Sequence, residues 1–147
     1  MKKLTWQDSV NFCNTLDFGN KSDWRLPSLT ELESLIDLSQ LSPSLPEGHP
    51  FINVQISSYW ASNSFASFAF DAWYFDFDKT YYNVGNKGSH RHVWPVRVGN
   101  FNKHNELIIS ELQIGQARFI DNLDGTITDN KTGLVWIEDL DSIYAIN

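Results

Sequence analysis

Three aspartates in residues 121–129, "DNLDGTITD", surround a glycine and suggest a calcium-binding loop. The spacing tests this idea, because an EF-hand places its glycine at the sixth position and acidic residues at the first and twelfth. With Gly125 at the sixth position, the first is Ile120 and the twelfth is Lys131. The pattern fails, and Asp and Asn are ordinary turn residues. We therefore predict a turn here and no metal site.

The stretch "HRH" at residues 90–92 offers two imidazoles to a metal ion. Residues two apart on a strand share a face, so His90 and His92 could bind one ion. No third ligand of a suitable type lies close in sequence, and His49 and His104 fall in poorly patterned loops. We predict exposed loop histidines and no metal.

Catalytic motifs are missing from the sequence, which has no GxSxG, no P-loop and no HExxH. Asp76 and Asp78 fall on one face of a predicted strand, where they could polarise water or bind a sugar hydroxyl. Carboxylates on a strand more often form a solvated face. We therefore predict that the chain is not an enzyme and needs no cofactor.

Charge is unevenly distributed along the chain. The net charge of −7 argues against duplex nucleic acid as a partner, because phosphate binding needs clustered Lys and Arg. Residues 79–105, however, contain five Lys and Arg and no acidic residue, with aromatic residues between them. A basic, aromatic strip on an acidic protein suits an anionic glycan or an acidic protein partner. The alternative is that these cations pair with acids elsewhere in the fold.

The predicted contact residues combine aromatic faces that can stack on sugar rings with cations that can pair with sulfate or carboxylate. They are Trp60, Trp73, Tyr81, Tyr82, Lys87, Arg91 and Trp94. The basic strip itself contains Lys79, Lys87, Arg91, Arg97 and Lys103.

Length and composition limit the class of protein. The 147 residues suit one domain, or one domain and a fragment, and 14% aromatic content supplies bulk for a core. No apolar run approaches the ~18 residues that a membrane span needs, and the first ten residues lack the apolar region of a signal peptide. The single cysteine, Cys13, cannot form an internal disulfide and is predicted to be a small buried residue.

Two helices are predicted near the start of the chain. The first spans residues 6–16, with Thr5 as its N-cap and an apolar stripe at helical spacing. The second begins after Ser28, which forms a capping box with Glu31, and ends near residue 38.

The sequence "DWRLP" leads into the second helix. Arg25 there can bind loop carbonyls or clamp a carboxylate such as Asp23. Its neighbours Trp24 and Leu26 are typical core residues and are expected to pack inward. We interpret Arg25 as a structural residue rather than a ligand-binding one.

Strands are predicted from residue 58 onward. "YWASNS" and "AWYFDF" have strand patterns, "NVGNKGSH" is a predicted loop, and "VWPVRV" at residues 93–98 is a third strand. Pro95 cannot donate a ladder hydrogen bond, so this strand should lie at an edge or contain a bulge. Residues 1–98 then form the main body, residues 99–117 a connector, and residues 118–147 a meander of short strands joined by turns.

Five stretches of the body resemble the bacterial domain family typified by the C-terminal domain of the collagen-like adhesin Lcl. The resemblance covers residues 5–98, and "DWRLPS" followed by "EL" is its most specific part. The five stretches are "TWQDSVNFCNTL", "SDWRLPSLTELESLID", "YWASNS", "AWYFDF" and "PVRV".

The order of the motifs is rotated relative to that family. "RFIDNLDGTITDNKTGLVW" at residues 118–136 also resembles the family, but there it opens the domain and here it comes last. Three explanations fit this order. The chain is a piece cut from a tandem array of domains, or a domain truncated at its front with a second copy beginning at residue 118. The third is a permuted or domain-swapped unit. Apolar residues such as Ile127 and Trp136 need cover, which favours packing of the meander on the 1–98 body.

The resemblance implies an extracellular or envelope-associated module with a C-type-lectin-like α+β fold, in which two helices pack on a twisted antiparallel sheet. It also implies binding of sulfated glycosaminoglycans and self-association. Family members often carry a second cysteine where this chain has Pro95, so a disulfide from Cys13 is not expected here. We expect a non-enzymatic module that binds a glycan or a protein; the alternative is a repeat or self-assembly module without a small ligand, as a homo-oligomer or a domain swap.

Overall fold

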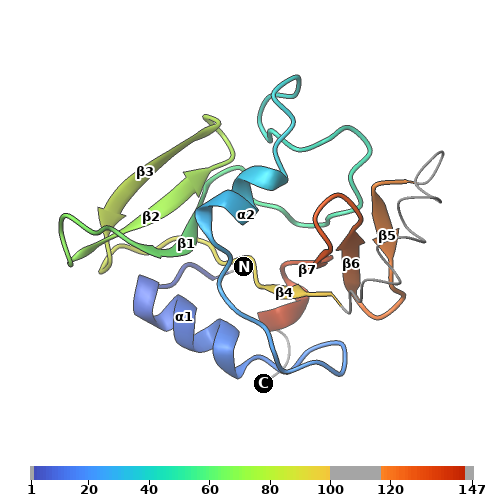
Figure 1. Ribbon diagram of the computed structural model, residues 1–147, viewed down its shortest axis with the longest axis horizontal. Helices are drawn as coiled ribbons and strands as arrows, with labels where there is room; N and C mark the ends of the chain where they lie inside the picture. Colours follow the sequence, from blue (N-terminus) through green and yellow to red (C-terminus); the bar gives the residue numbers. More distant parts are fainter. Residues whose placement is uncertain (1, 100–116, 145–147) are drawn as a thin grey trace.

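The computed structural model describes residues 2–99 and 117–144, which form two α-helices and two antiparallel sheets (Figure 1). A short 3₁₀ helix, η1 (Ser142–Tyr144), follows the last strand. The predicted α+β class is confirmed, with two sheets in place of one. Apart from its two end residues, the connector predicted at 99–117 lies outside the described residues.

None of the helices in the described ranges has the length and apolar character that a bilayer-spanning segment requires.

Helix α1 (Trp6–Thr15) matches the predicted first helix to within one residue. The Thr5 side chain caps it by accepting a hydrogen bond from the backbone N–H of Asp8. Cys13 is fully buried on the inner face of this helix, as predicted. Burial raises the pKa of its thiol, because the charged thiolate is poorly solvated there. The thiol is therefore unreactive at neutral pH.

Helix α2 (Leu29–Ser34) has the predicted capping box, in which Ser28 and Glu31 bond each other's backbone N–H groups. The helix ends about one turn earlier than the predicted residue 38. Asp37 explains the early end, because its carboxylate accepts the backbone N–H of Ser39 in a turn at 2.9 Å. The backbone N–H of Asp37 donates outside the helix, to the carbonyl of Ser44 at 2.8 Å.

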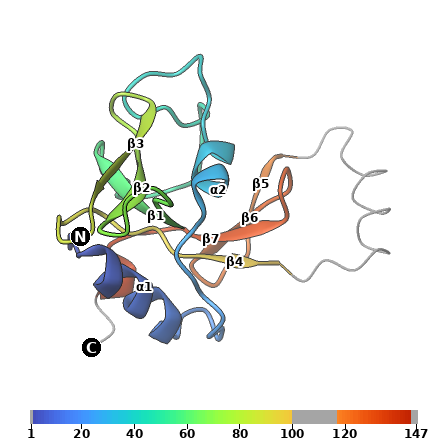
Figure 2. The same cartoon turned by 60° about the vertical axis from the view of Figure 1, so that its left-hand side comes forward.

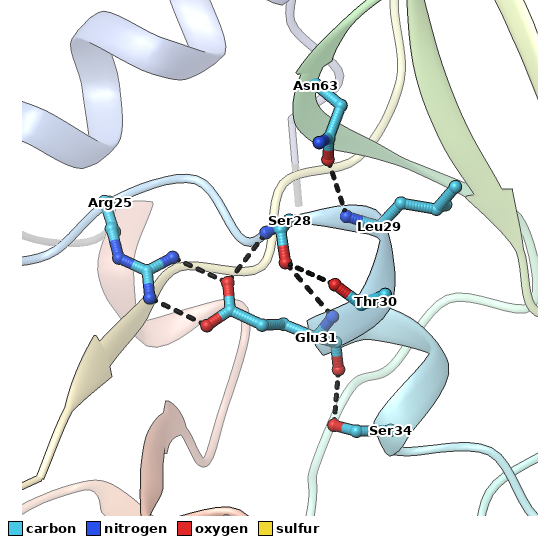
Figure 3. Close-up of polar contacts among 7 residues, drawn as sticks. All are labelled: Arg25, Ser28, Leu29, Thr30, Glu31, Ser34 and Asn63. Carbon is cyan, nitrogen blue, oxygen red and sulfur yellow. Dashed lines mark hydrogen bonds and ion pairs between the residues drawn. The ribbon is translucent and has the colours of Figure 1, made fainter.

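An ion pair fixes the start of α2 (Figure 3). Arg25 donates from both Nη atoms to the two carboxylate oxygens of Glu31, at 2.6 and 2.7 Å. Glu31 Oε1 also accepts the backbone N–H of Ser28 at 2.8 Å, so one carboxylate serves the ion pair and the cap together. Burial alone would raise the pKa of Glu31, but the hydrogen bonds from Arg25 and Ser28 hold that pKa below its ordinary value.

The neighbours of Arg25 behave partly as predicted. Trp24 and Leu26 are buried, and the Trp24 indole N–H donates to the carbonyl of Phe18 at 3.1 Å. The prediction that Arg25 could clamp Asp23 is wrong, because Asp23 pairs with Arg97 at 2.6 Å instead. The capping carboxylate of Glu31 engages Arg25 at two points, and Asp23 is left to pair with the arginine of β4.

The first sheet has the strand order β1-β2-β3 and is built from two consecutive hairpins. Its two faces are both covered near the middle: Phe75 belongs to the core cluster that contains Leu32 of α2, and Tyr74 to the cluster that contains Cys13 of α1. Its strands are β1 (Ser58–Ser64), β2 (Asp71–Asp76) and β3 (Tyr81–Asn86).

Strand β3 corrects the prediction that "NVGNKGSH" is a loop. It pairs with the whole of β2, from Asp71 opposite Asn86 to Asp76 opposite Tyr81. Asn and Gly have low strand propensity, but a long antiparallel partner supplies backbone hydrogen bonds that outweigh that preference. The segment becomes a loop only after Asn86.

The second sheet has the strand order β4-β7-β6-β5, and the three C-terminal strands form the predicted meander. Strand β4 lies at one end of this order and directly follows Pro95, so the predicted edge position is confirmed. It is shorter than the predicted 93–98. The strands are β4 (Val96–Val98), β5 (Phe119–Asp121), β6 (Thr126–Asp129) and β7 (Leu134–Ile137).

The two parts of the chain share one hydrophobic core. Strands β4 and β7 pair from Val96 opposite Trp136 to Val98 opposite Leu134. The rings of Trp94 and Trp136, both fully buried, meet at a centroid distance of 5.5 Å. The meander therefore packs on the 1–98 segment of the same chain.

Helix α2 lies between the two sheets in both ribbon views (Figures 1 and 2). Arg118, just before β5, donates to the carbonyl of Ser34 at the end of α2 at 2.6 Å. The same guanidinium forms two hydrogen bonds to the fully buried Asp129, at 2.9 and 2.8 Å. A single arginine thus joins α2 to two strands of the second sheet.

His92 is buried, which corrects its prediction as an exposed loop residue. Its backbone N–H donates to the carbonyl of Ser58, and its ring lies 5.4 Å from that of Tyr59. The pKa of His92 is lowered from 6.5 to about 4. Burial is the larger cause, and the positive charge of Lys3 is a smaller one. The folded protein therefore holds this imidazole in its neutral form.

We predict that Arg25→Ala lowers the free energy of unfolding by about 1–3 kcal/mol, because a half-buried carboxylate loses its partner. Urea unfolding measures this loss. Arg25→Lys should lose less, since it keeps the charge but not the two-point contact. The exposed Lys131→Ala serves as a control and should unfold like the natural protein; an unchanged free energy in Arg25→Ala would contradict the role of the ion pair.

We also predict that His92 makes the fold less stable in acid. The unfolded chain binds a proton on this histidine near pH 6.5, whereas the folded one does so only near pH 4. Stability from this group is complete above pH 6.5 and falls by up to about 3 kcal/mol toward pH 4. Urea unfolding at several pH values should show a shallower fall for His92→Gln than for the exposed control His90→Gln. Parallel curves for the two variants would show that His92 has no such effect.

Candidate ligand-binding site

Two of the predicted contact residues lie in the core. Trp60 and Trp94 are both fully buried, and their indole N–H groups donate to the carbonyls of Leu4 and Ile137, at 2.9 and 3.1 Å. Neither ring can stack on a ligand, which corrects their place in the predicted contact set. Their size and apolar character suit a core as well as a contact surface, so sequence alone does not separate the two roles.

Arg91 is packed against aromatic rings rather than presented to solvent. Its guanidinium lies 3.6 Å from the ring centre of Tyr74 and 5.0 Å from that of Trp60, and Nη1 donates to the Ser58 hydroxyl at 2.9 Å. Gly85 makes room for it, because a Cβ at that position would lie 2.5 Å from Arg91 Nη2. The cation is held within the fold.

Lys87 also makes contacts within its own chain. Its Nζ donates to the Ser64 hydroxyl at 2.6 Å and to the Ala69 carbonyl at 2.8 Å. It lies 4.5 Å from the ring centre of Trp6, so it joins helix α1 to the loop between β1 and β2. The lysine is half-buried and keeps part of its surface open to solvent.

The basic strip predicted for residues 79–105 is not continuous in space. Lys79 precedes β3 and Lys87 follows it, so about 20 Å of strand separates them. Arg97 pairs with Asp23, and its side chain is only 9% exposed. This cation therefore follows the alternative given in the sequence analysis, in which cations of the strip pair with acids elsewhere in the fold. Phe101, Lys103 and His104 lie outside the described residues.

Three aromatic side chains gather on the face of the first sheet that α2 partly covers. Trp73 contacts Phe65 at a ring distance of 5.6 Å and Tyr82 at 5.8 Å. Tyr82 is 53% exposed, while Phe65 and Trp73 are half-exposed. We call Phe65, Trp73 and Tyr82 the aromatic surface. Tyr81 points to the opposite face, where its ring lies 6.4 Å from that of Tyr74.

An open groove of about 310 Å³ adjoins the aromatic surface and shares Tyr82 with it. Its floor is apolar and includes Ile36 and Phe75. Two polar residues, Glu33 and Thr80, also line it, and the Thr80 hydroxyl is hydrogen-bonded to that of Ser44. A cleft with an apolar floor and a few polar groups at fixed positions is the usual form of a small-ligand site.

The sequence analysis missed several residues of this region. Phe65 follows the predicted strand in "FASFAF", a stretch without alternation, and Ile36 falls within the second helix as predicted, which was expected to end near residue 38. Ile36 and Leu38, which line the groove, follow the end of α2 at Ser34. Three phenylalanines within the six residues "FASFAF" are the sequence signal that could have identified the region.

The other candidate groups have structural roles. Asp129 is buried in its ion pair with Arg118, and Asp124 Oδ1 accepts the backbone N–H of Thr126 at 3.0 Å in the turn before β6. Across residues 2–99 and 117–144, no three His, Cys, Asp or Glu side chains are close enough together to hold a metal ion.

Comparison with known proteins adds one finding to this geometry. The model of the Lcl C-terminal domain family matches residues 1–97, which include both helices, the first sheet and the start of β4. No curated protein and no solved structure matches the chain. Because the match covers more than half of the 147 residues, the chain belongs to the Lcl C-terminal domain family.

Proposed function

We propose that this chain is a non-catalytic binding module that holds a glycan against its aromatic surface. The observation that carries the proposal is the contact of Trp73 with Phe65 and Tyr82 on one exposed face beside an open groove. The C–H face of a sugar ring is apolar and flat, so it packs well on indole and phenol rings. Three contiguous rings offer room for more than one sugar unit.

The groove supports the same proposal with polar groups. Sugar hydroxyls need hydrogen-bond partners, and Glu33 and Tyr82, which line the groove beside the aromatic surface, carry groups that can provide them. The dispersed cations support a neutral ligand rather than a strongly anionic one, because Arg91 and Arg97 are engaged within the fold. Glu33 would also repel a sulfate placed in the groove.

A lectin-like role at the cell surface or envelope is part of the proposal. Its support is the membership of a family typified by the C-terminal domain of an adhesin. The non-catalytic part rests on the sequence, in which we found no nucleophile with a partner base.

Self-assembly is the second candidate function. Leu38 and Leu41 are 83% and 85% exposed in the loop after α2, and Leu38 lines the groove. Exposed leucines beside an apolar groove suit contact with a second copy of the chain.

We predict that Trp73→Ala and Tyr82→Ala each weaken glycan binding by about tenfold or more, the range of a buried aromatic contact. A glycan array identifies ligands for the natural protein, and titration calorimetry with the best ligand measures the variants. Tyr81→Ala is the matched control, since it removes the same side chain from the opposite face and should change affinity less than about twofold.

The salt dependence of binding distinguishes a neutral glycan ligand from a sulfated one. Stacking on a neutral sugar should be almost unchanged between low and high salt, whereas binding of a sulfated chain would weaken as screening increases. Absence of any glycan ligand, or equal effects of Tyr81→Ala and Tyr82→Ala, would refute the proposed site.

Self-assembly has a separate test. If it is the function, light scattering at rising concentration should show an oligomer, and Leu38→Ser with Leu41→Ser should return it to a monomer. A natural protein that stays monomeric at all concentrations tested would exclude this candidate.

A further inference from the structure

Strand β3 is the outer strand of the first sheet (Figure 1). The other sheet edges are covered or short. Along β1, His92 exchanges backbone hydrogen bonds with Ser58 and Trp60, each at 3.1 Å. Along β4, Arg25 exchanges two with Val96, at 2.9 and 3.0 Å. Strand β5 has only three residues. Within residues 2–99 and 117–144, the six-residue β3 is therefore the one long edge without cover.

The sequence of β3 leaves this edge open to a further strand. Its residues, "YYNVGN", include no charged residue and no proline, and its pairing with β2 has no bulge. Across the described residues, no backbone N–H or C=O of residues 81–85 bonds an element other than β2. The backbone N–H of Val84 donates to the side chain of its own neighbour Asn83, at 2.8 Å. Proteins usually block an edge with charges, prolines or bulges, and β3 has none of these.

Arg91 lies against this edge, on the face of the sheet opposite to the aromatic surface. Gly85 and Tyr81 share that face of β3, because four residues separate them. A Cβ on Gly85 would lie 2.5 Å from Arg91 Nη2, so the guanidinium occupies the space that a larger residue would fill. The absence of a side chain on Gly85 therefore places a cation next to the open edge.

No carboxylate balances the charge of Arg91. Its guanidinium donates to the neutral hydroxyl of Ser58 and packs on two aromatic rings, which carry no charge. In the part of the chain that the structure describes, Arg91 forms no ion pair, and its buried Nε has no acceptor. Asp76 of β2 lies on the same face but opposite Tyr81, four residues along β3 from Gly85. A half-buried cation of this kind attracts an anion.

From these observations we propose that β3 receives an extended segment of a partner protein as a fourth strand, and that an Asp or Glu of this segment pairs with Arg91. Directly opposed residues of neighbouring strands have Cβ atoms about 4.5–5.5 Å apart, so a carboxylate opposite Gly85 can reach Arg91 Nη2. In this mode of binding the main-chain hydrogen bonds supply affinity, and the side-chain contact supplies specificity.

The same chemistry distinguishes this partner from a second copy of the chain. Strand β3 contains no Asp or Glu, so β3 of another copy has no carboxylate to place opposite Gly85. The glycan site lies on the other face of the sheet, so the inference does not rest on the glycan proposal.

Synthetic peptides test the proposal on the full chain. The probe is the labelled peptide Ser-Val-Thr-Val-Glu-Val-Thr-Ser, whose β-branched residues favour an extended conformation. Its matched control carries Gln in place of Glu. By fluorescence anisotropy, we expect the Glu peptide to bind and the Gln peptide to bind at least about tenfold more weakly, the range of a hydrogen bond between charged groups.

Two variants separate the specific ion pair from general attraction. In Arg91→Gln the Glu and Gln peptides should bind with affinities within about twofold of each other, because the partner of the carboxylate is lost. Lys79→Gln is the matched control, since Lys79 is an exposed cation just before β3, and it should keep the difference between the peptides. Circular dichroism and the unfolding midpoint check that both variants fold.

N-methylated peptides test the strand geometry on the natural protein, without a substitution in the chain. Alternate N–H groups of an added strand face β3, and the others face solvent. Methylation of one alternate set in the Glu peptide should therefore abolish binding, whereas methylation of the other set should change affinity less than about threefold.

Three outcomes would overturn the proposal: no binding of the Glu peptide, equal affinities of the Glu and Gln peptides for the natural protein, or equal effects of the two methylation patterns. A dimer that the Glu peptide dissociates would assign the edge to a second copy and also overturn it. Trp73→Ala should leave peptide affinity unchanged, so this proposal and the glycan proposal fail independently.

Discussion

The pairing of β4 with β7 is the contact on which the rest of the molecule depends. It joins the segment that matches the family model to the C-terminal meander, and it brings Trp136 onto Trp94. Phe51 of the first part likewise contacts Phe119 of β5 at 5.2 Å. Residues 1–97 therefore share a core with residues 117–144, and the unit that folds is larger than the unit that the family model matches.

This core uses most of the large rings, and three of those left outside it form the aromatic surface. Trp24, Trp60, Trp94 and Trp136 are buried, each at a junction between elements. Trp73, on the central strand β2, is the tryptophan of this sheet that stays partly exposed, and it contacts Phe65 and Tyr82 there.

Features that depend on a few adjacent residues could be predicted from the sequence. Both helix caps, the inward Trp24, the edge strand after Pro95 and the turns of the meander follow from local sterics and hydrogen bonding. Strand β3 could not be predicted, because its stability comes from β2 and not from its own residues.

The candidate site was predictable only in part, for a similar reason. Tyr82 is exposed and Trp73 is partly exposed, but nothing local distinguishes these two rings from the buried Trp60 and Trp94. Arg97 and Arg91 also had the expected charge, and only the fold shows that Asp23 and two aromatic rings engage them. Burial and long-range pairing set the outcome in each case.

The contact between Tyr144 and the beginning of the chain has a consequence for how such domains are encoded. The Tyr144 ring stacks on Phe12 at 5.2 Å, and its hydroxyl lies 3.5 Å from the Lys2 carbonyl. Residues 2 and 144 are thus near neighbours, and a short peptide could link them. If the polypeptide were then opened between residues 99 and 117, the meander would come first in translation and every strand would keep its place. Circular permutation of one gene would interconvert the two motif orders around a single unchanged three-dimensional arrangement.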